Sequence, residues 1–326
     1  MIYDVHVMCN PLFDIQAEVS EDLLAELGYE KGGMFLIDEA QQKDLISKIY
    51  THIVNTEAGG SGANTVIGMA QLGGSAAYTG KVAEDEHGTH YIEGLRAKGI
   101  RLGATAGTGT TGICVVLITP DAQRTLCTFL GICRELDADD VNAELITQSK
   151  YLYVTSYLWD TDTQKAAVLK GMKAAKEAGV KVALSLSDPF CVGRHKEELL
   201  GIIRDHVDVL IGNVDEARHL SDTDTPQDAA DALLPYCDLV AVTMDSRGSL
   251  LHTAEESVLV PAYRVTPVDT TGAGDMYAAG LLYGLTHGLS LQKTGELASY
   301  VAARVVGQLG PRLDTIDAEE LKAVLA

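Results

Sequence analysis

The segment KYLYVTSYLWDTDTQKAAVLKGMKAAKEAGVKVALSLS, residues 150–187, decides the fold class because it contains a strand, a helix and a second strand in succession. KYLYVTS and VKVALSLS are short apolar runs with β-branched residues, which are typical of buried strands. The stretch between them has a helical pattern, with capping candidates at Asp160, Thr161 and Asp162 and a terminating glycine at Gly179. Continuous apolar strands are expected where both faces of a parallel sheet are covered.

The same alternation of strand and helix extends through much of the chain. Further strand-like runs are YDVHVMC, SAAYTGKV, VDVLIGN and DLVAVTMDS, and helical patterns lie between several of them. This order predicts an α/β fold with a mainly parallel sheet and helices on both of its faces.

Some segments depart from this rhythm. FDIQAEVS and GGMFLIDE have the pattern of short strands flanking a helix, and RLGATAGTGTTGICVVLITPDAQRTLCTFLG has that of consecutive antiparallel strands joined by turns. We therefore expect a single domain over 1–326 with a small inserted β lid, formed by about 14–38 and part of 101–130. Lid strands can pair between subunits or stay apart, so a monomer and a homodimer both remain open.

The composition is that of a globular chain with an acidic excess. Of the 326 residues, 46% are hydrophobic and 22% are charged, so a core can be buried without disulfides. The formal net charge of −21 argues against a nucleic-acid partner, because phosphate contacts need basic patches. No apolar run approaches the roughly 18 residues of a membrane span, and the N-terminus lacks the features of a signal peptide. A cytoplasmic protein is expected.

Three patterns suggest sites that their context does not support. GTGTTG at 107–112 has the spacing of a dinucleotide-binding loop, but a strand follows it where that motif needs a helix. This disfavours an NAD-linked oxidoreductase. His87 and His90 form an HxxH without a second ligand pair nearby, and the six cysteines are scattered, mostly within apolar runs, which favours core positions.

VDTTGAGD, residues 268–275, lies between a strand-like YRVTPVDT and the helical pattern DMYAAGLLYGLTHG. The first turn of a helix has backbone N–H groups without internal partners, and glycines let an anion approach them closely. A carboxylate beside such an anion site, here Asp275, suits a general base that accepts a proton from a hydroxyl. The pattern alone also fits a first-turn capping residue after a glycine turn.

DTTGAGD resembles the C-terminal signature of the PfkB, or ribokinase-like, carbohydrate kinase family. GGSGANTVIGMAQLGGSAAYTGKVAEDEHG at 59–88 is similar to the family's N-terminal signature, and NPLFDI at 10–15 resembles the adenosine-kinase-like branch. The resemblance implies a ribokinase-like three-layer α/β/α sandwich with a small β lid. It also implies that ATP and Mg²⁺ are used to phosphorylate a primary hydroxyl of an adenosine-like nucleoside or a sugar. Asp275 would be the base, and the anion hole would be Gly272, Ala273 and Gly274.

The resemblance also implies residues that face the nucleotide. NVDE matches the family's metal-linked motif, with Glu216 acting on Mg²⁺ through water and Asn213 beside it. Thr243 and Gly248 match a nucleotide-facing segment. Without the resemblance, NVDEARHLS reads as an ordinary helix start with acidic residues in its first turn.

For the acceptor, the resemblance implies Asp14, Gly59, Gly60 and Asn64. A carboxylate accepts hydrogen bonds from adjacent sugar hydroxyls, an amide both donates and accepts, and glycines permit close approach of the ring. Arg124 would contact the substrate or the transferred phosphate, although a surface arginine fits the pattern equally well.

Members of the family often use a monovalent cation beside the anion hole. Asp269 and Thr271 occupy the matching positions for K⁺, and carbonyls near Val305, Gln308 and Gly310 would complete its shell. The local GQLGPRLD departs from the family's commoner pattern by a proline, which leaves potassium dependence open.

The acceptor itself stays open at this level. Phe13, Met34, Leu36 and Phe129 are candidates for the apolar walls of a purine site, or for a small core within the lid. A nucleoside is the first choice. The alternatives are a hexose, ribose or other sugar as the acceptor, and a nucleotide- or sugar-binding protein without catalysis.

Overall fold

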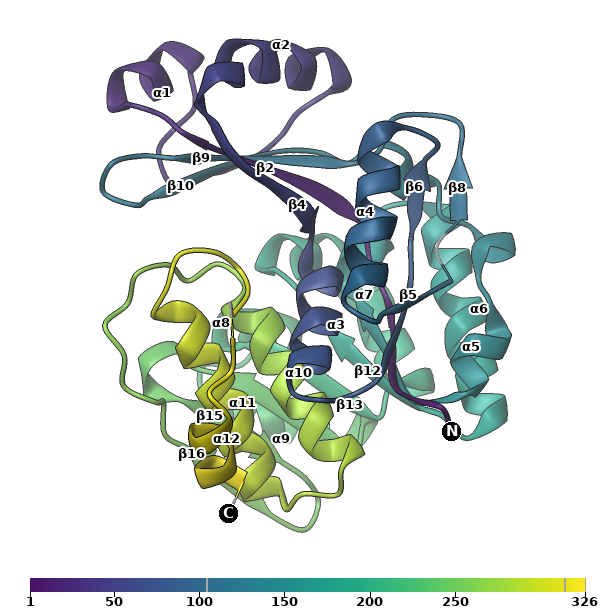
Figure 1. Ribbon diagram of the computed structural model, residues 1–326. Coiled ribbons are helices and arrows are strands. Elements are labelled where there is room, and N and C mark those ends of the chain that lie inside the picture. Colours follow the sequence, from purple (N-terminus) through teal and green to yellow (C-terminus); the bar gives the residue numbers. More distant parts are fainter. Residues whose placement is uncertain (104, 314, 326) are drawn as a thin grey trace.

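The computed structural model describes residues 1–103, 105–313 and 315–325, which contain a nine-stranded sheet, a five-stranded sheet and a two-stranded sheet. Figure 1 shows the large sheet among its helices in the body of the molecule, with the five-stranded sheet beside this body.

The large sheet is mainly parallel, which confirms the prediction. Neighbouring strands are parallel from β7 to β14, whereas β15 and β16 at one edge run antiparallel to their neighbours. The strands lie in the order β16 (Ser257–Val260), β15 (Ser249–His252), β14 (Leu239–Thr243), β13 (Val209–Asn213), β12 (Lys181–Ser185), β11 (Ser149–Thr155), β1 (Tyr3–Met8), β5 (Ala76–Thr79) and β7 (Arg101–Leu102).

Helices cover both faces of the large sheet, as predicted. One face carries α3 (Ser61–Gln71), α10 (Ala273–Thr286) and α11 (Leu291–Val306). The other face carries α5 (Ala143–Thr147), α6 (Asp162–Ala178), α7 (Pro189–His206), α8 (Val214–Ser221) and α9 (Pro226–Leu233). α12 (Ala318–Leu325) packs on α11, and α4 (Glu86–Ala97) contacts β4 and β7. Short 3₁₀ turns occupy Tyr50–His52, Gly131–Glu135, Ala138–Asp140, Ser156–Trp159, Leu234–Tyr236 and Asp245–Arg247.

Burial on both faces explains why the strands are apolar throughout. In β14, Leu239 and Ala241 belong to the core beneath α10 and α11, and Val240 and Val242 belong to the core beneath α8 and α9. Successive side chains of a strand point to opposite faces, so the four buried positions 239–242 of β14 all carry apolar residues.

The segment 150–187 forms β11, α6 and β12, and both strands are parallel neighbours in the sheet. Of the three capping candidates, Thr161 is the N-cap, and its side chain accepts a hydrogen bond from the amide of Gln164. The helix ends at Gly179, whose φ of 71° lies in the left-handed region.

The five-stranded sheet and two helices form a unit that we call the lid. Its strands, in spatial order, are β3 (Met34–Leu36), β10 (Arg124–Phe129), β9 (Ile113–Ile118), β2 (Leu12–Glu18) and β4 (Ile53–Gly59). The helices α1 (Glu21–Leu27) and α2 (Glu39–Ile49) lie on the outer side of this sheet (Figure 1).

The structure corrects the predicted strands of the lid in two respects. β4 lies outside the ranges 14–38 and 101–130, and the sequence prediction missed it. The run at 101–130 is also not one antiparallel series: β9 and β10 pair antiparallel, but β7 joins the large sheet. β8 (Thr105–Gly107) pairs in parallel with β6 (Lys81–Ala83).

The GTGTTG run and the HxxH pair of His87 and His90 lie in the packed structure of the protein. GTGTTG forms the end of β8 and the loop before β9, where the amide and hydroxyl of Thr111 donate to Asp85 at 2.8 and 2.6 Å. The ring of His87 lies 4.9 Å from that of Phe13. Within the described ranges, no three His, Cys, Asp or Glu side chains form a group that holds a metal ion. None of the helices described is long and apolar enough to cross a bilayer.

Candidate active site

The N-terminus of α10 is shaped by Gly272. Its φ of 77° is left-handed, and a Cβ built there would lie 2.2 Å from the carbonyl oxygen of Pro311, so only glycine fits. Among the described residues, no side chain caps this helix end, but the amide of Ala273 donates to the carbonyl of Thr270 at 3.2 Å. The amides of Gly272 and Gly274 have no such partner within the described residues and are left for an anion, assisted by the positive end of the helix dipole. Gly274 is exposed, and a Cβ there would meet nothing within 4 Å.

Asp275 follows in the first turn of α10. The Nδ2 amide of Asn64, on α3, donates a hydrogen bond to its Oδ2 atom at 2.8 Å. Burial raises the pKa of Asp275 to about 6, while hydrogen bonds from Asn64 and Ser61 and the charge of Arg312 partly oppose this rise. The group is thus ionised at neutral pH yet basic enough to accept a proton.

Asp14 and the glycine pair lie next to this carboxylate. Asp14, on β2, is buried, and its carboxyl group lies so close to Gly59 that a Cβ there would be 2.1 Å from it. Burial raises the pKa of Asp14 to about 7, against the charge of Arg312 as the strongest opposing influence. Gly60 begins α3 with a φ of 83°, close to the carbonyl of Asn10. The structure therefore brings Asp14, Gly59, Gly60, Asn64 and Asp275 together.

Arg312 belongs to the same cluster and was missed by the sequence prediction. Its Nε donates to Asn64 Oδ1 at 2.9 Å, its Nη1 to Glu57 Oε2 at 2.8 Å, and its Nη2 to the carbonyl of Ala58. The available signal was a basic residue directly after the Gly–Pro turn of GQLGPRLD, the segment in which the family pattern changes.

The candidates on the nucleotide side form a second group at the carboxyl ends of β13 and β14. Asn213 caps α8, and its backbone amide and side-chain Nδ2 donate to Glu216 at 2.8 and 2.7 Å. Burial raises the pKa of Glu216 to about 7. Thr243 pairs with Asn213 across the sheet, and Gly248 has a φ of 94°, where a Cβ would lie 1.9 Å from the carbonyl of Val260.

Tyr157 interacts electrostatically with both groups. Burial raises its pKa well above the usual value, and the negative charges of Asp188, Asp275 and Glu216 add to this rise. Its hydroxyl donates to the carbonyl of Ser187 at 3.3 Å. Among the described residues, no hydrogen bond connects Asn213 or Glu216 directly with Asp275. The sequence prediction did not include Tyr157.

Arg124 and Asp269 form an ion pair between the lid and the segment before α10. Arg124 Nε lies 2.9 Å from Asp269 Oδ2, in an alignment that leaves the N–H without a hydrogen-bond partner among the described residues. Asp269 also accepts from the amides of Thr271 at 3.0 Å and Gly310 at 2.9 Å. Both carboxylate oxygens are thus engaged by protein groups. The structure places Arg124 on this carboxylate.

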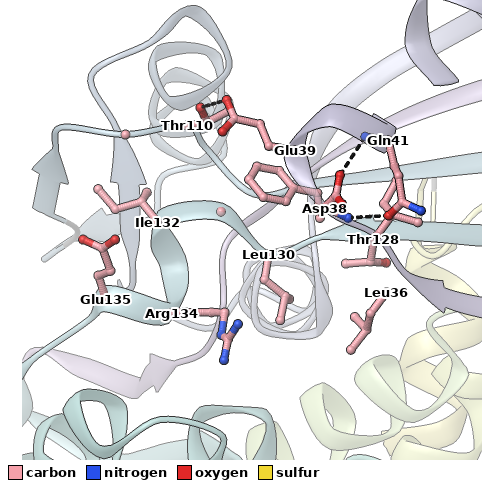
Figure 2. Close-up of a pocket in the computed structure, with 14 residues that line it drawn as sticks. Leu36, Asp38, Glu39, Gln41, Thr110, Thr128, Leu130, Ile132, Arg134 and Glu135 are labelled. Atoms are coloured by element: carbon pink, nitrogen blue, oxygen red, sulfur yellow. Dashed lines mark hydrogen bonds between the residues drawn. The ribbon is translucent and has the colours of Figure 1, made fainter. Parts of the chain in front are cut away.

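A cavity of about 650 Å³ lies where the lid meets the segment 130–135 (Figure 2). Leu36 and Phe129 line it from the lid, together with Thr128, Gln41 and Arg134, which supply polar groups. Of the four proposed apolar wall residues, Leu36 and Phe129 therefore lie at a cavity. Phe13 is buried against His87, and Met34 is exposed without lining this cavity.

A mainly parallel sheet covered on both faces, a small second sheet, and a carboxylate beside a glycine-shaped helix N-terminus fit a phosphotransferase with an alcohol acceptor, and the comparisons with known proteins show this class. Residues 36–318 match the pfkB family carbohydrate kinases, and the chain belongs to this family, with its ribokinase-like fold.

The relatives include nucleoside and sugar kinases. The adenosine kinase from Sinorhizobium meliloti is 37% identical, with a TM-score of 0.88 and coverage of 99% of both chains. A probable sugar kinase from Rhizobium etli is 35% identical, with a TM-score of 0.90, covering 99% of this chain and 98% of its own. The probable chloroplastic fructokinase-6 of Arabidopsis thaliana is 30% identical over 81% of this chain and 71% of its own.

Proposed function

We propose that the chain transfers the terminal phosphoryl group of ATP to a primary hydroxyl of a purine nucleoside such as adenosine. The observation that carries this proposal is the carboxylate of Asp275, which accepts a hydrogen bond from Asn64 and lies in the first turn of α10. The similarity to an adenosine kinase over the whole chain supports the choice of acceptor.

The transfer needs a base, an anion site and a held acceptor. Asp275 takes the proton of the acceptor hydroxyl as the oxygen attacks phosphorus, and the bond from phosphorus to the leaving oxygen of ADP breaks. The amides of Gly272, Ala273 and Gly274 stabilise the negative charge that develops on the phosphoryl oxygens, and for this the amide of Ala273 exchanges the carbonyl of Thr270 for the phosphoryl group. Asp14 and Asn64 hold the other hydroxyls of the acceptor.

The kinase family implies Mg²⁺ with ATP, and the oxygen donors near Glu216 fit this ion. The carboxylate of Glu216 is engaged by Asn213, and the carboxylates of Asp188 and Asp215 lie near enough to raise its pKa. Such a set suits a hydrated Mg²⁺ held through water and nucleotide phosphates, where it neutralises phosphate charge. In this proposal Thr243 and Gly248 line the nucleotide.

The residues proposed for K⁺ do not fit that ion in this structure. The carboxylate of Asp269 is engaged by Arg124 and by the amides of Thr271 and Gly310. The carbonyl of Val305 accepts from the amide of Gln308 at 3.1 Å. No step of the proposed transfer passes through K⁺.

A neutral sugar is the second candidate acceptor, because sugar kinases are among the relatives. An anionic acceptor is disfavoured since Arg312, the cation nearest to Asp275, already donates to three protein oxygens. We further propose that the lid closes over the bound acceptor and excludes water.

Release of ADP from Mg-ATP tests the proposal across adenosine, guanosine, inosine, ribose, fructose and a sugar phosphate. We expect turnover with a purine nucleoside, and a loss of about 10³-fold or more in Asp275→Asn, which keeps the shape but removes the base. Turnover with fructose or ribose but with no nucleoside would show that the acceptor is a sugar. Acceptor binding by calorimetry without ADP release would instead favour a binding protein.

A further inference from the structure

Arg312 is a largely buried cation, and each of its three guanidinium nitrogens donates to a separate protein oxygen. It lies in the segment after α11, and its side chain is 12% exposed. Two of those acceptors, Glu57 and the carbonyl of Ala58, belong to lid strand β4, and the third is the side-chain oxygen of Asn64 on α3. A guanidinium held by three protein oxygens in this way serves the protein's own geometry.

The contact with Asn64 fixes which end of its amide faces the base. An amide has one accepting oxygen and one donating nitrogen, whereas arginine only donates. With Arg312 Nε on Oδ1 at 2.9 Å, the Nδ2 group is directed to Asp275 at 2.8 Å. The reversed amide would place N–H₂ against a guanidinium and oxygen against a carboxylate, so two buried contacts would become repulsive.

We propose that Arg312 is a positioning residue for phosphotransfer, which locks the amide of Asn64 in the orientation that donates to Asp275 and connects this pair to lid strand β4 through Glu57. The inference rests on the proposed role of Asp275 as the base. Arg312 acts through Asn64 and by its charge, without contact to the reacting atoms.

The groups around Asp275 determine what removal of Arg312 does to its titration. Cys9, Asp14, Tyr153 and Tyr157 are the titratable groups that interact with it, and Arg312 is the nearby cation. The pKa values of Cys9 and the two tyrosines are raised by burial, so these groups stay neutral near pH 6 to 7. Asp14 titrates in the same range as Asp275, and the charge of Arg312 lowers both values.

The test compares Arg312→Gln and Arg312→Lys with the wild type, using Arg304→Gln as a control for loss of a half-exposed arginine from α11. In Arg312→Gln we expect kcat to fall by about 10- to 100-fold with little change in the KM for ATP. The acidic limb of the pH–kcat profile should move to higher pH. Arg312→Lys should return the acidic limb most of the way to its wild-type pH, because lysine restores the positive charge. It should restore only part of kcat, because lysine lacks the planar set of guanidinium donors that holds Asn64 and β4.

Two further measurements separate positioning from general damage. In an Asn64→Ala background, Arg312→Gln should cost little more in kcat at a pH above the acidic limb, where Asp275 is ionised in every variant and Arg312 acts only through the amide. Carboxyl ¹³C resonances of the ligand-free protein should show Asp275 titrating at higher pH in Arg312→Gln, with Asp14→Asn as a background that removes the overlapping titration. This readout needs no turnover, so it decides the inference even if no acceptor is found. Additive losses, or an unchanged Asp275 titration in Arg312→Gln, would overturn it.

Discussion

At the scale of single residues, the candidate site combines a proposed base, Asp275, which burial makes less acidic, with donors that favour its ionised form. The pKa of Asp275 rises from 3.8 to about 6, so the folded protein holds this proton more tightly than the unfolded chain. Ionisation of Asp275 therefore costs folding stability above pH 3.8, and the full cost is present above about pH 6. Catalytic usefulness and stability are opposed at this position.

Asp275→Asn should therefore stabilise the protein while it abolishes turnover. At pH 8 we expect a gain of about 1–3 kcal/mol in the free energy of unfolding, because the variant no longer buries a charge. The difference should shrink at pH 4, where the wild-type group is largely protonated in the folded state. Urea unfolding at both pH values measures it. An Asp275→Asn protein that is less stable than the wild type at pH 8 would contradict the assignment of a buried carboxylate.

At the scale of elements, the start of α10 contains two glycines that are needed for different reasons. Gly272 is required by the backbone, since its left-handed φ places the missing Cβ against Pro311. Gly274 has open space around it, so its small size matters only for an approaching phosphate. The sequence shows a glycine at both positions, and only the structure shows that each is needed for a different reason.

We expect Gly272→Ala to lose about 2 kcal/mol or more of stability, because the methyl group forces the Pro311 segment and Arg312 to move. Gly274→Ala should keep or slightly raise stability, by up to about 1 kcal/mol, because alanine favours helix. Its kcat should still fall, since the methyl group blocks the approach to the amides. Chemical denaturation and ADP release measure the two effects. If Gly274→Ala kept the wild-type kcat, the amide of Gly274 would not be part of the anion hole.

The local patterns of the chain predicted the layers of the fold and singled out Asp275 as the candidate base, but they did not predict the whole candidate site. The apolar runs of β11 and β12 and the glycines near Asp275 are local signals, so the sequence displays them directly. Strand β4, IVNTEAG, was missed because it is largely exposed and has no apolar run. Arg312 was missed because its role depends on Asn64, 248 positions away, and no local pattern carries that contact.

At the scale of the whole molecule, two arginines connect the lid with the segments before α10 and after α11. One of them belongs to the lid and the other to the body. Arg124 extends from lid strand β10 to Asp269, and Arg312 extends from the segment after α11 to lid strand β4. Both side chains are largely buried. Loss of one partner from a buried ion pair is costly because the other charge is left uncompensated. The position of the lid is thus coupled to the segments that flank the proposed anion hole.

Arg124→Gln should loosen the lid. Because Asp269 then keeps its amide donors but loses its cation, we expect faster amide hydrogen exchange at 124–129 and at 265–272, with little change in the core strands β11 and β12. Hydrolysis of ATP without acceptor should rise by a few-fold as water gains access. The exposed Arg101 on β7 offers a matched control, Arg101→Gln, for which neither quantity should change. Unchanged exchange at both segments in Arg124→Gln would show that this ion pair does not hold the lid against the body.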